Sequence, residues 1–138
     1  MKKITFSILA TLLIVSCSQS SQEQAPEQSV VEYVWHSAGA DFNAQNLAKL
    51  IDEWNQIITD SGMAMNGANI LTPTVSSENY DFIWVMQWPS MSARDAGWDY
   101  WMKNASEQWS QSIEGIMSFD TDNAFAFNVI DFTPPKVE

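Results

Sequence analysis

The stretch that most constrains this fold is residues 80–88, which read YDFIWVMQW. In a β-strand, alternate side chains point to opposite faces of the sheet. One set of alternate positions here is entirely aromatic or thioether, and the other set still contains the aliphatic residues Ile83 and Val85. An antiparallel sheet with one face in water would show polar residues on that face. The sequence therefore predicts a sheet that is covered on both sides.

The rest of the chain predicts the element order β-α-β-β-α-β. Residues rich in β-branched and aromatic side chains, bounded by turn-forming residues, mark the strands, and apolar residues at helical spacing mark the helices. The expected strands are 30–37, 68–75, 80–88 and 124–132, and the expected helices are 44–61 and 93–115. Asn43 is suited to cap the first helix, and Gly62 to end it in the left-handed conformation.

The second predicted helix is unusually rich in tryptophan. Ser92 and Asp95 fit a capping box at its start. The apolar positions expected on one stripe are Trp98, Trp101, Met102, Ala105, Trp109, Ile113 and Ile116. A glycine inside a helix costs about 1 kcal/mol relative to alanine. Gly97 therefore indicates either close backbone packing or space for a ligand.

This element order predicts the ferredoxin-like α+β fold. Right-handed crossovers place both helices on one face of a four-stranded antiparallel sheet. The other face remains apolar, because strands 30–37 and 124–132 also carry apolar residues on both sides. Large exposed apolar patches usually mark a binding surface. A second copy of the chain, packed sheet to sheet, is the simplest cover, so we expect a homodimer.

Residues 30–132 resemble the dimeric α+β barrel superfamily, which includes antibiotic-biosynthesis-monooxygenase-like and stress-responsive barrel domains. The resemblance is carried by the order and lengths of the elements and by the Trp-rich helix that follows WPSMSARDAGWDYW (88–101). It implies two ferredoxin-like protomers with their sheets facing each other. Members of the superfamily include cofactor-free oxygenases, haem-binding enzymes, isomerases and proteins without a known reaction, so the fold does not choose a function.

The N-terminus predicts export and lipidation. Lys2 and Lys3 precede the apolar run 4–15, which is too short to cross a bilayer and has the length of a signal peptide core. The sequence Ile-Val-Ser-Cys that ends at Cys17 resembles a bacterial lipobox. The resemblance implies a diacylglycerol on the Cys17 sulfur, cleavage before Cys17 and N-acylation, as with palmitate. The alternative is an ordinary signal peptide with a chance cysteine.

The predicted organisation is a signal peptide (1–16), a lipidated flexible tether (17–29), the ferredoxin-like domain (30–133) and a tail (134–138). Ser18 after the cysteine, instead of aspartate, favours the outer membrane, with the domain facing the periplasm. Removal of the signal takes away two lysines and no acid, so the net charge changes from −11 to −13. Such a chain has no basic surface for nucleic acid or anionic lipid. We expect membrane contact through the lipid anchor only.

His36, the only histidine, is the candidate general base, because an imidazole titrates near neutral pH. The alternative is a strand-end histidine without a role. One histidine and one lipidated cysteine do not make a zinc or copper site. The haem-binding relatives place their ligand on the second helix, where residues 96–109 contain no histidine. We therefore expect no metal and no cofactor.

The tryptophans are the candidate ligand-binding residues. Trp84 and Trp88 on the third strand could face the second helix, where Trp98, Trp101 and Trp109 lie, and form a pocket for a flat apolar ligand. The alternative is that they belong to the core and the dimer interface. The acidic stretch DTDN (120–123) lacks the spacing of an EF-hand, so a solvated surface is its simpler interpretation.

The sequence does not state a reaction. The leading hypothesis is an envelope lipoprotein that binds a small apolar or aromatic ligand, or only its own copy. One alternative is a cofactor-independent enzyme of the monooxygenase or isomerase type that uses His36. Another is a purely structural envelope protein.

Overall fold

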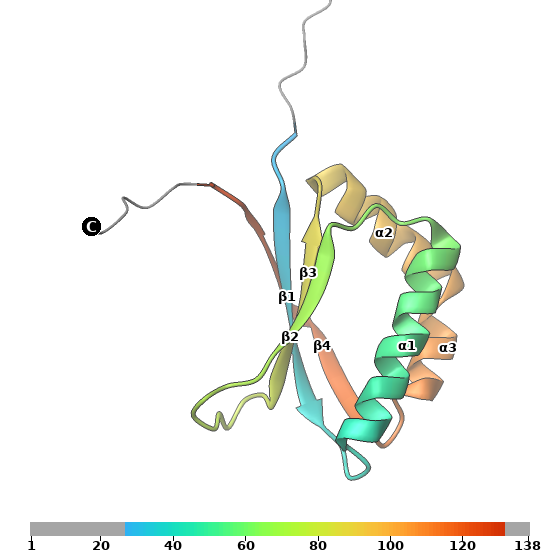
Figure 1. Ribbon diagram of the computed structural model, residues 1–138, viewed down its shortest axis with the longest axis vertical. Helices are drawn as coiled ribbons and strands as arrows, with labels where there is room; N and C mark the ends of the chain where they lie inside the picture. The colour runs from blue at the N-terminus through green and yellow to red at the C-terminus, as the bar shows by residue number, and fades with distance from the viewer. Residues whose placement is uncertain (1–26, 132–138) are drawn as a thin grey trace, which may run out of the picture.

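The structure is a computed structural model that describes residues 27–131 (Figure 1). The predicted signal peptide, Cys17 and most of the tether and tail lie outside the described residues. The elements are β1 (Val30–Ala38), α1 (Ala44–Ser61), β2 (Gly67–Leu71), β3 (Phe82–Trp88), α2 (Met91–Asn104), α3 (Ser106–Ser112) and β4 (Met117–Asn128).

The strands form one antiparallel sheet in the order β2-β3-β1-β4, and the helices all lie on one face of it (Figure 1). This arrangement confirms the predicted ferredoxin-like α+β fold. Val34 in the central strand β1 lies opposite Trp84 of β3 on one side and Ala124 of β4 on the other. Among residues 27–131, no helix is both long enough and apolar enough to cross a membrane.

Helix α1 has the ends that the sequence predicts. The Asn43 side chain accepts a hydrogen bond from the Asn46 N–H at 2.9 Å, which satisfies one of the free donors of the first turn. Gly62 ends the helix with φ = 65°, a conformation that glycine adopts without steric cost. Leu50 and Trp54 are the buried residues of the helix and belong to the core between helix and sheet.

The predicted start of the second helix was wrong by two residues. The cap is Ser90, not Ser92, and its hydroxyl accepts a hydrogen bond from the Ala93 N–H at 3.1 Å. Met102, which we expected on the apolar stripe, is 63% exposed. The helix divides at Ala105, so the predicted single helix 93–115 is in fact α2 and α3.

Side-chain hydrogen bonds accompany this division. The Asn104 amide and the Ser106 hydroxyl donate to the carbonyls of Tyr100 and Met102, each four residues earlier. Such bonds compete with the helical backbone and bend helices. The bend keeps Trp101, Trp109 and Ile113 buried although the stripe is not straight.

Strand β4 begins earlier than predicted. The expected loop 118–123 is part of the strand, because Ser118 and Phe119 already pair with Ser37 and His36 of β1. The register then shifts: Val34 pairs with Ala124, so β4 carries extra residues opposite a short piece of β1. Asp and Asn are depleted in strands, which is why DTDN resembled a loop. The structure shows that it is a β-bulge.

Other strand boundaries also moved. β4 ends at Asn128 and not at residue 132. β2 ends at Leu71, before Pro73, which has no N–H to contribute to a sheet. β3 begins at Phe82, so Tyr80 lies outside the strand.

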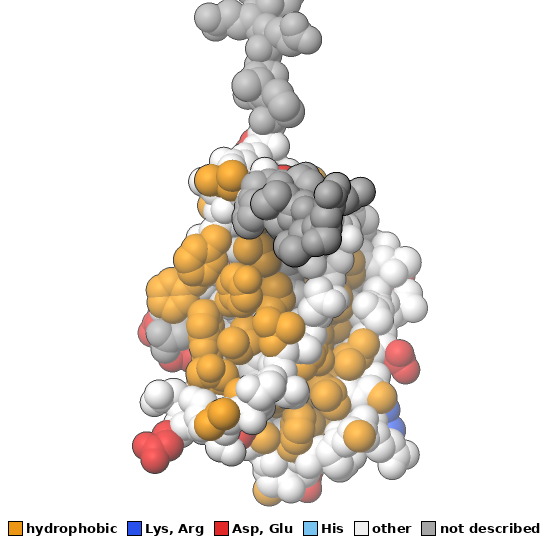
Figure 2. Space-filling model, turned by 60° about the vertical axis from the view of Figure 1, so that its left-hand side comes forward, with side chains coloured by type: hydrophobic (Ala, Val, Ile, Leu, Met, Phe, Trp, Pro, Cys, Tyr) orange, Lys and Arg blue, Asp and Glu red, His pale blue; other side chains and the backbone are white. Residues whose placement is uncertain are grey.

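The sheet has two apolar faces, as the pattern predicted. Phe82, Trp84, Met86 and Trp88 of β3 are buried and belong to the core under the helices. The opposite face, which we call the open face, carries Tyr33, Trp35, Leu71, Ile83, Val85, Phe125 and Phe127. Figure 2 shows hydrophobic side chains gathered on the side of the molecule away from the helices. Phe125 and Phe127 are 48% and 52% exposed there.

Candidate functional site

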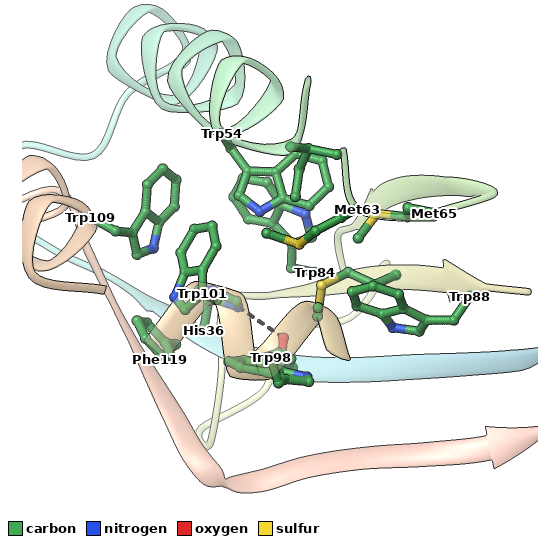
Figure 3. Close-up of a pocket in the computed structure, with 14 residues that line it drawn as sticks. His36, Trp54, Met63, Met65, Trp84, Trp88, Trp98, Trp101, Trp109 and Phe119 are labelled. Atoms are coloured by element: carbon green, nitrogen blue, oxygen red, sulfur yellow. Dashed lines mark hydrogen bonds between the residues drawn. The ribbon is translucent and has the colours of Figure 1, made fainter. Parts of the chain in front are cut away.

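A pocket lies between the sheet and the helices (Figure 3). Its volume is about 50 Å³. Its walls are almost entirely aromatic, thioether or aliphatic. Within residues 27–131 they are Val34, His36, Trp54, Ile58, Met63, Met65, Trp84, Met86, Trp88, Gly97, Trp98, Trp101, Trp109 and Phe119.

The structure brings all the predicted pocket residues together. His36 comes from β1, Trp84 and Trp88 from β3, and Trp98 and Trp101 from α2. Trp54 of α1 and the methionines that follow this helix complete the wall, and the sequence interpretation did not assign them to a site. Trp54 lies four residues after Leu50 and four before Ile58, and this helical spacing of apolar residues is the signal that could have placed it here. The role of the site residues in binding stays a prediction.

His36 is a buried, neutral imidazole. Its Nδ1 lies 2.8 Å from the Val34 carbonyl oxygen, which can only accept, so Nδ1 carries the proton. Its ring stacks on Phe82 with centroids 4.9 Å apart. Burial lowers the pKa of His36 to about 4, although the hydrogen bond to Val34 acts in the opposite direction. At pH 7 the Nε2 lone pair is therefore available as an acceptor in the pocket.

Trp84 supplies a donor to the same pocket. Its side chain is buried, and its indole Nε1–H has no hydrogen-bond partner among the described residues. An unsatisfied buried donor costs about 1–3 kcal/mol. The ring is surrounded by Trp54, Trp109 and His36, with centroid distances of 5.5, 6.0 and 5.8 Å. Trp84 is therefore the polar group in this wall that most needs a partner.

Glu32 lies beside the pocket and was missed by the sequence analysis. The residue is 0% exposed. Its Oε2 accepts from the indole N–H groups of Trp88 at 3.1 Å and Trp98 at 2.9 Å, and its Oε1 accepts from Arg94 Nε at 2.9 Å. The signal was present, because Glu32 occupies the same alternate positions on β1 as Val30, Val34 and His36. The strand was interpreted from its apolar residues alone.

Glu32 connects three elements and orients part of the pocket wall. Burial acts to lower the pKa of Arg94, but the hydrogen bonds and the charges of Glu32 and Asp95 raise it above its ordinary value. The Arg94 guanidinium therefore stays charged. Since the carboxylate already accepts from three side chains, it has little capacity left for a ligand. Its effect on the pocket is to hold the indoles of Trp88 and Trp98.

Gly97 is explained by packing. A Cβ at this position would lie 2.7 Å from two atoms of the Trp88 ring. Cβ atoms do not approach that closely, so a glycine is required for α2 to lie against Trp88. Of the two explanations considered from the sequence, close approach of the backbone is the one that the contacts support.

The acidic residues do not assemble a metal centre in the part of the chain that the structure describes. Within it, no group of three or more His, Cys, Asp or Glu side chains could hold a metal ion. In the bulge of β4, Asp120 Oδ1 accepts a hydrogen bond from the Asp122 backbone N–H at 2.9 Å.

Comparisons with known proteins support the fold. No family model matches the chain, and no curated protein matches it significantly. A dimeric ferredoxin-like protein from an uncultured marine organism aligns with a TM-score of 0.53 and 9% identity, over 78% of this chain and 100% of that one. Hydroxynitrile lyase from Passiflora edulis aligns with a TM-score of 0.51 and 8% identity, over 79% and 99%. At these identities the likeness concerns the fold alone.

Proposed function

We propose that this chain is an exported lipoprotein whose ferredoxin-like domain binds a small, mainly apolar molecule between its sheet and its helices. The observation that carries the proposal is the pair of polar groups in the pocket. The Trp84 indole N–H has no partner among the described residues, and the neutral His36 offers an acceptor. Ligand sites are typically apolar pockets with a few polar groups that fix orientation.

The volume of the pocket limits its ligand. A cavity of about 150 Å³ accommodates benzene. The volume of this pocket is about 50 Å³, so it admits a molecule of only a few heavy atoms. A flat aromatic ligand requires the wall to open. Met63 and Met65 are suited to this, because unbranched thioether side chains repack easily.

The test is to identify what the pocket holds. The full chain is purified from its host, and its native mass is compared with the mass of the lipidated polypeptide. Indole N–H resonances then report on occupation, with Trp84→Phe used to assign the Trp84 signal and Trp35→Phe, on the open face, as the control. We expect a bound molecule whose removal shifts the Trp84 signal and not the Trp35 signal. A mass without ligand, with Trp84 bonded only to buried water, would refute the proposal and leave a structural protein.

A second candidate function is catalysis with His36 as a general base. It is favoured by the Nε2 lone pair of His36 in an apolar pocket. It is weakened by the pKa of about 4, since an efficient base has a pKa near the working pH. The test is to measure turnover of lyase, isomerase and oxygenase substrates by the wild type and by His36→Asn. Turnover that disappears in the variant while ligand affinity is retained would establish the enzyme.

The homodimer and the location are part of the proposal. The apolar open face and the dimeric ferredoxin-like neighbour support sheet-to-sheet pairing. The lipobox-like sequence before Cys17 supports an anchor in the outer membrane, with the domain in the periplasm. Processing that stops in the presence of globomycin would support lipidation of Cys17. Normal maturation under that inhibitor would contradict it.

A further inference from the structure

The pocket between the sheet and the helices contains a buried donor and a buried acceptor, the indole N–H of Trp84 and the Nε2 of His36. Each of the two residues is 5% exposed. Since the function proposed above places the ligand in this pocket, the choice of ligand rests on that function and on these two groups. The pocket lies on the helix side of the sheet, so a sheet-to-sheet homodimer does not cover it (Figure 1).

The pocket offers no charge to a ligand. None of its described lining residues is an Asp, Glu, Lys or Arg, and burial keeps His36 neutral at pH 7. The carboxylate of Glu32, which lies beside the pocket, already accepts from three side chains. An ion that enters an apolar site without a counter-charge loses its hydration without compensation. The ligand that fits this pocket is therefore uncharged.

The two polar groups of the pocket require opposite partners. The Trp84 Nε1–H can only donate, and it has no partner among the described residues. The Nδ1–H of His36 is used by the Val34 carbonyl, so the Nε2 of the same ring can only accept. The Trp84 and His36 rings are neighbours in the pocket wall, with centroids 5.8 Å apart. A hydroxyl group accepts through its oxygen and donates through its hydrogen, so it can satisfy both residues.

A single water molecule would not fill the pocket. A water needs a cavity of about 10–15 Å³ and two to four polar partners. The volume here is about 50 Å³. The rest of the wall is mainly aromatic, thioether or aliphatic, as with Met63 and Met65, and such side chains favour an alkyl group over further water. A hydroxyl attached to a short alkyl chain therefore fits both parts of the pocket.

We propose that the ligand of this pocket is a small uncharged alcohol, whose hydroxyl accepts from Trp84 Nε1 and donates to His36 Nε2. Its alkyl group lies against the apolar wall. Longer alcohols of the same class enter when the unbranched side chains of Met63 and Met65 repack. A ketone or nitrile would satisfy Trp84 and leave His36 without a donor, so the pair of groups distinguishes an alcohol from a molecule that only accepts.

The test compares propan-2-ol, acetone and acetate, which have the same number of heavy atoms. Acetone accepts a hydrogen bond but cannot donate one, and acetate carries a charge. Each is titrated into the full chain in a non-ionic detergent, after exchange into ligand-free buffer. Saturation-transfer NMR on the methyl protons of the probe measures affinity, and the Trp84 indole N–H resonance locates the site. Molecules of this size bind with dissociation constants on the order of 1 mM.

We expect propan-2-ol to bind about two- to tenfold more tightly than acetone, because only the alcohol donates to His36. Acetate should not bind. If acetone or acetate binds as tightly as propan-2-ol, the choice of an alcohol is overturned and the proposed apolar pocket stands. If no probe binds and the Trp84 resonance does not shift, the pocket itself is refuted, and the proposed function fails together with the alcohol.

Two variants locate the hydroxyl. His36→Asn keeps a donor for the Val34 carbonyl but removes Nε2, so the preference for propan-2-ol over acetone should disappear. Trp84→Phe is the matched control, because it removes a hydrogen bond that both probes accept, so the ratio of their affinities should stay the same. A preference that survives in His36→Asn would contradict the assigned partner of the hydroxyl. If either variant fails to fold, the three probes on the wild type still decide the class of ligand.

Discussion

Burial of His36 makes the stability of the folded protein depend on pH. Its pKa falls from an ordinary value of 6.5 to about 4 because the folded protein removes the imidazole from water. Between these two pH values the unfolded chain binds more protons at this position than the folded chain does. The free energy of unfolding therefore decreases as the pH falls through this window, and the contribution of His36 is constant above it.

This gives a pH-dependent prediction for His36→Asn, which cannot titrate but can still donate to the Val34 carbonyl. From the two pKa values, the wild type should lose about 2 kcal/mol more than the variant between pH 7.5 and pH 5. Denaturant titrations of both proteins at the two pH values measure the difference. A gap between wild type and variant that is the same at both pH values would show that His36 is not buried as a neutral group.

Glu32 is the residue whose charge is most deeply enclosed. In Glu32→Gln the side-chain amide brings donors to a position that now accepts from Arg94, Trp88 and Trp98. Removing one member of a buried ion pair costs about 3–5 kcal/mol, and the partial exposure of Arg94 reduces this to roughly 2–3 kcal/mol. Urea denaturation measures the loss.

The matched control for this prediction is Glu53→Gln. Glu53 on α1 accepts from Gln108 and Ser112, both of which are neutral donors. A glutamine can keep one acceptor there, so the cost should stay below about 1 kcal/mol. If both variants lost the same stability, the Glu32 ion pair would contribute no more than an ordinary neutral hydrogen bond.

At the level of elements, the contact between α2 and β3 depends on the absence of a side chain at Gly97. Gly97→Ala would gain helix propensity of about 1 kcal/mol, but its Cβ would overlap the Trp88 ring. Overpacking of a core costs about 1–3 kcal/mol, so the net loss of stability that we expect is up to about 2 kcal/mol. Thermal or denaturant unfolding measures it.

A double-mutant cycle with Trp88→Phe tests the cause. Both ring atoms that would contact the new Cβ belong to the outer part of the indole, which phenylalanine lacks. In a chain that already carries Trp88→Phe, the Gly97→Ala substitution should therefore be neutral or stabilising. If Gly97→Ala cost the same stability in both backgrounds, its cause would be the backbone of α2 and not the contact with Trp88.

At the level of the whole molecule, the oligomeric state decides whether a second protomer covers the apolar open face. Phe127 is 52% exposed on that face. Its ring packs edge-on against the Tyr33 ring, with the ring centroids 5.7 Å apart. If the open faces of two protomers meet, Phe127→Asp places a buried charge in the interface and should convert the dimer to a monomer. Light scattering on the eluting protein gives the mass directly.

Met102→Asp is the control for the dimer. Met102 is 63% exposed on α2, which lies on the opposite side of the sheet. The same substitution there should leave the mass unchanged. A wild-type protein that is monomeric at every concentration would contradict the sheet-to-sheet dimer and would require a different protein to cover the open face.

The sequence by itself determined the features that depend on local interactions. Asn43 and Gly62 set the ends of α1 because capping involves only neighbouring residues. The alternation in residues 80–88 predicted two apolar faces, and the element order predicted the sheet and the placement of the helices. Strand parity placed Trp84 and Trp88 on one face of the sheet, and helical spacing placed Trp98 and Trp101 on one stripe of the helix, because both patterns are properties of the chain alone.

The tertiary structure decided what depends on residues far apart in the chain. Glu32 is a buried acceptor only because Arg94, more than sixty residues away in the chain, reaches it from α2. The residues DTDN resemble a loop, and they become part of β4 because β1 pairs with the strand on both sides of them. Which apolar face meets the helices follows from the packing of α1 and α2, and parity cannot supply that choice because it treats both faces alike.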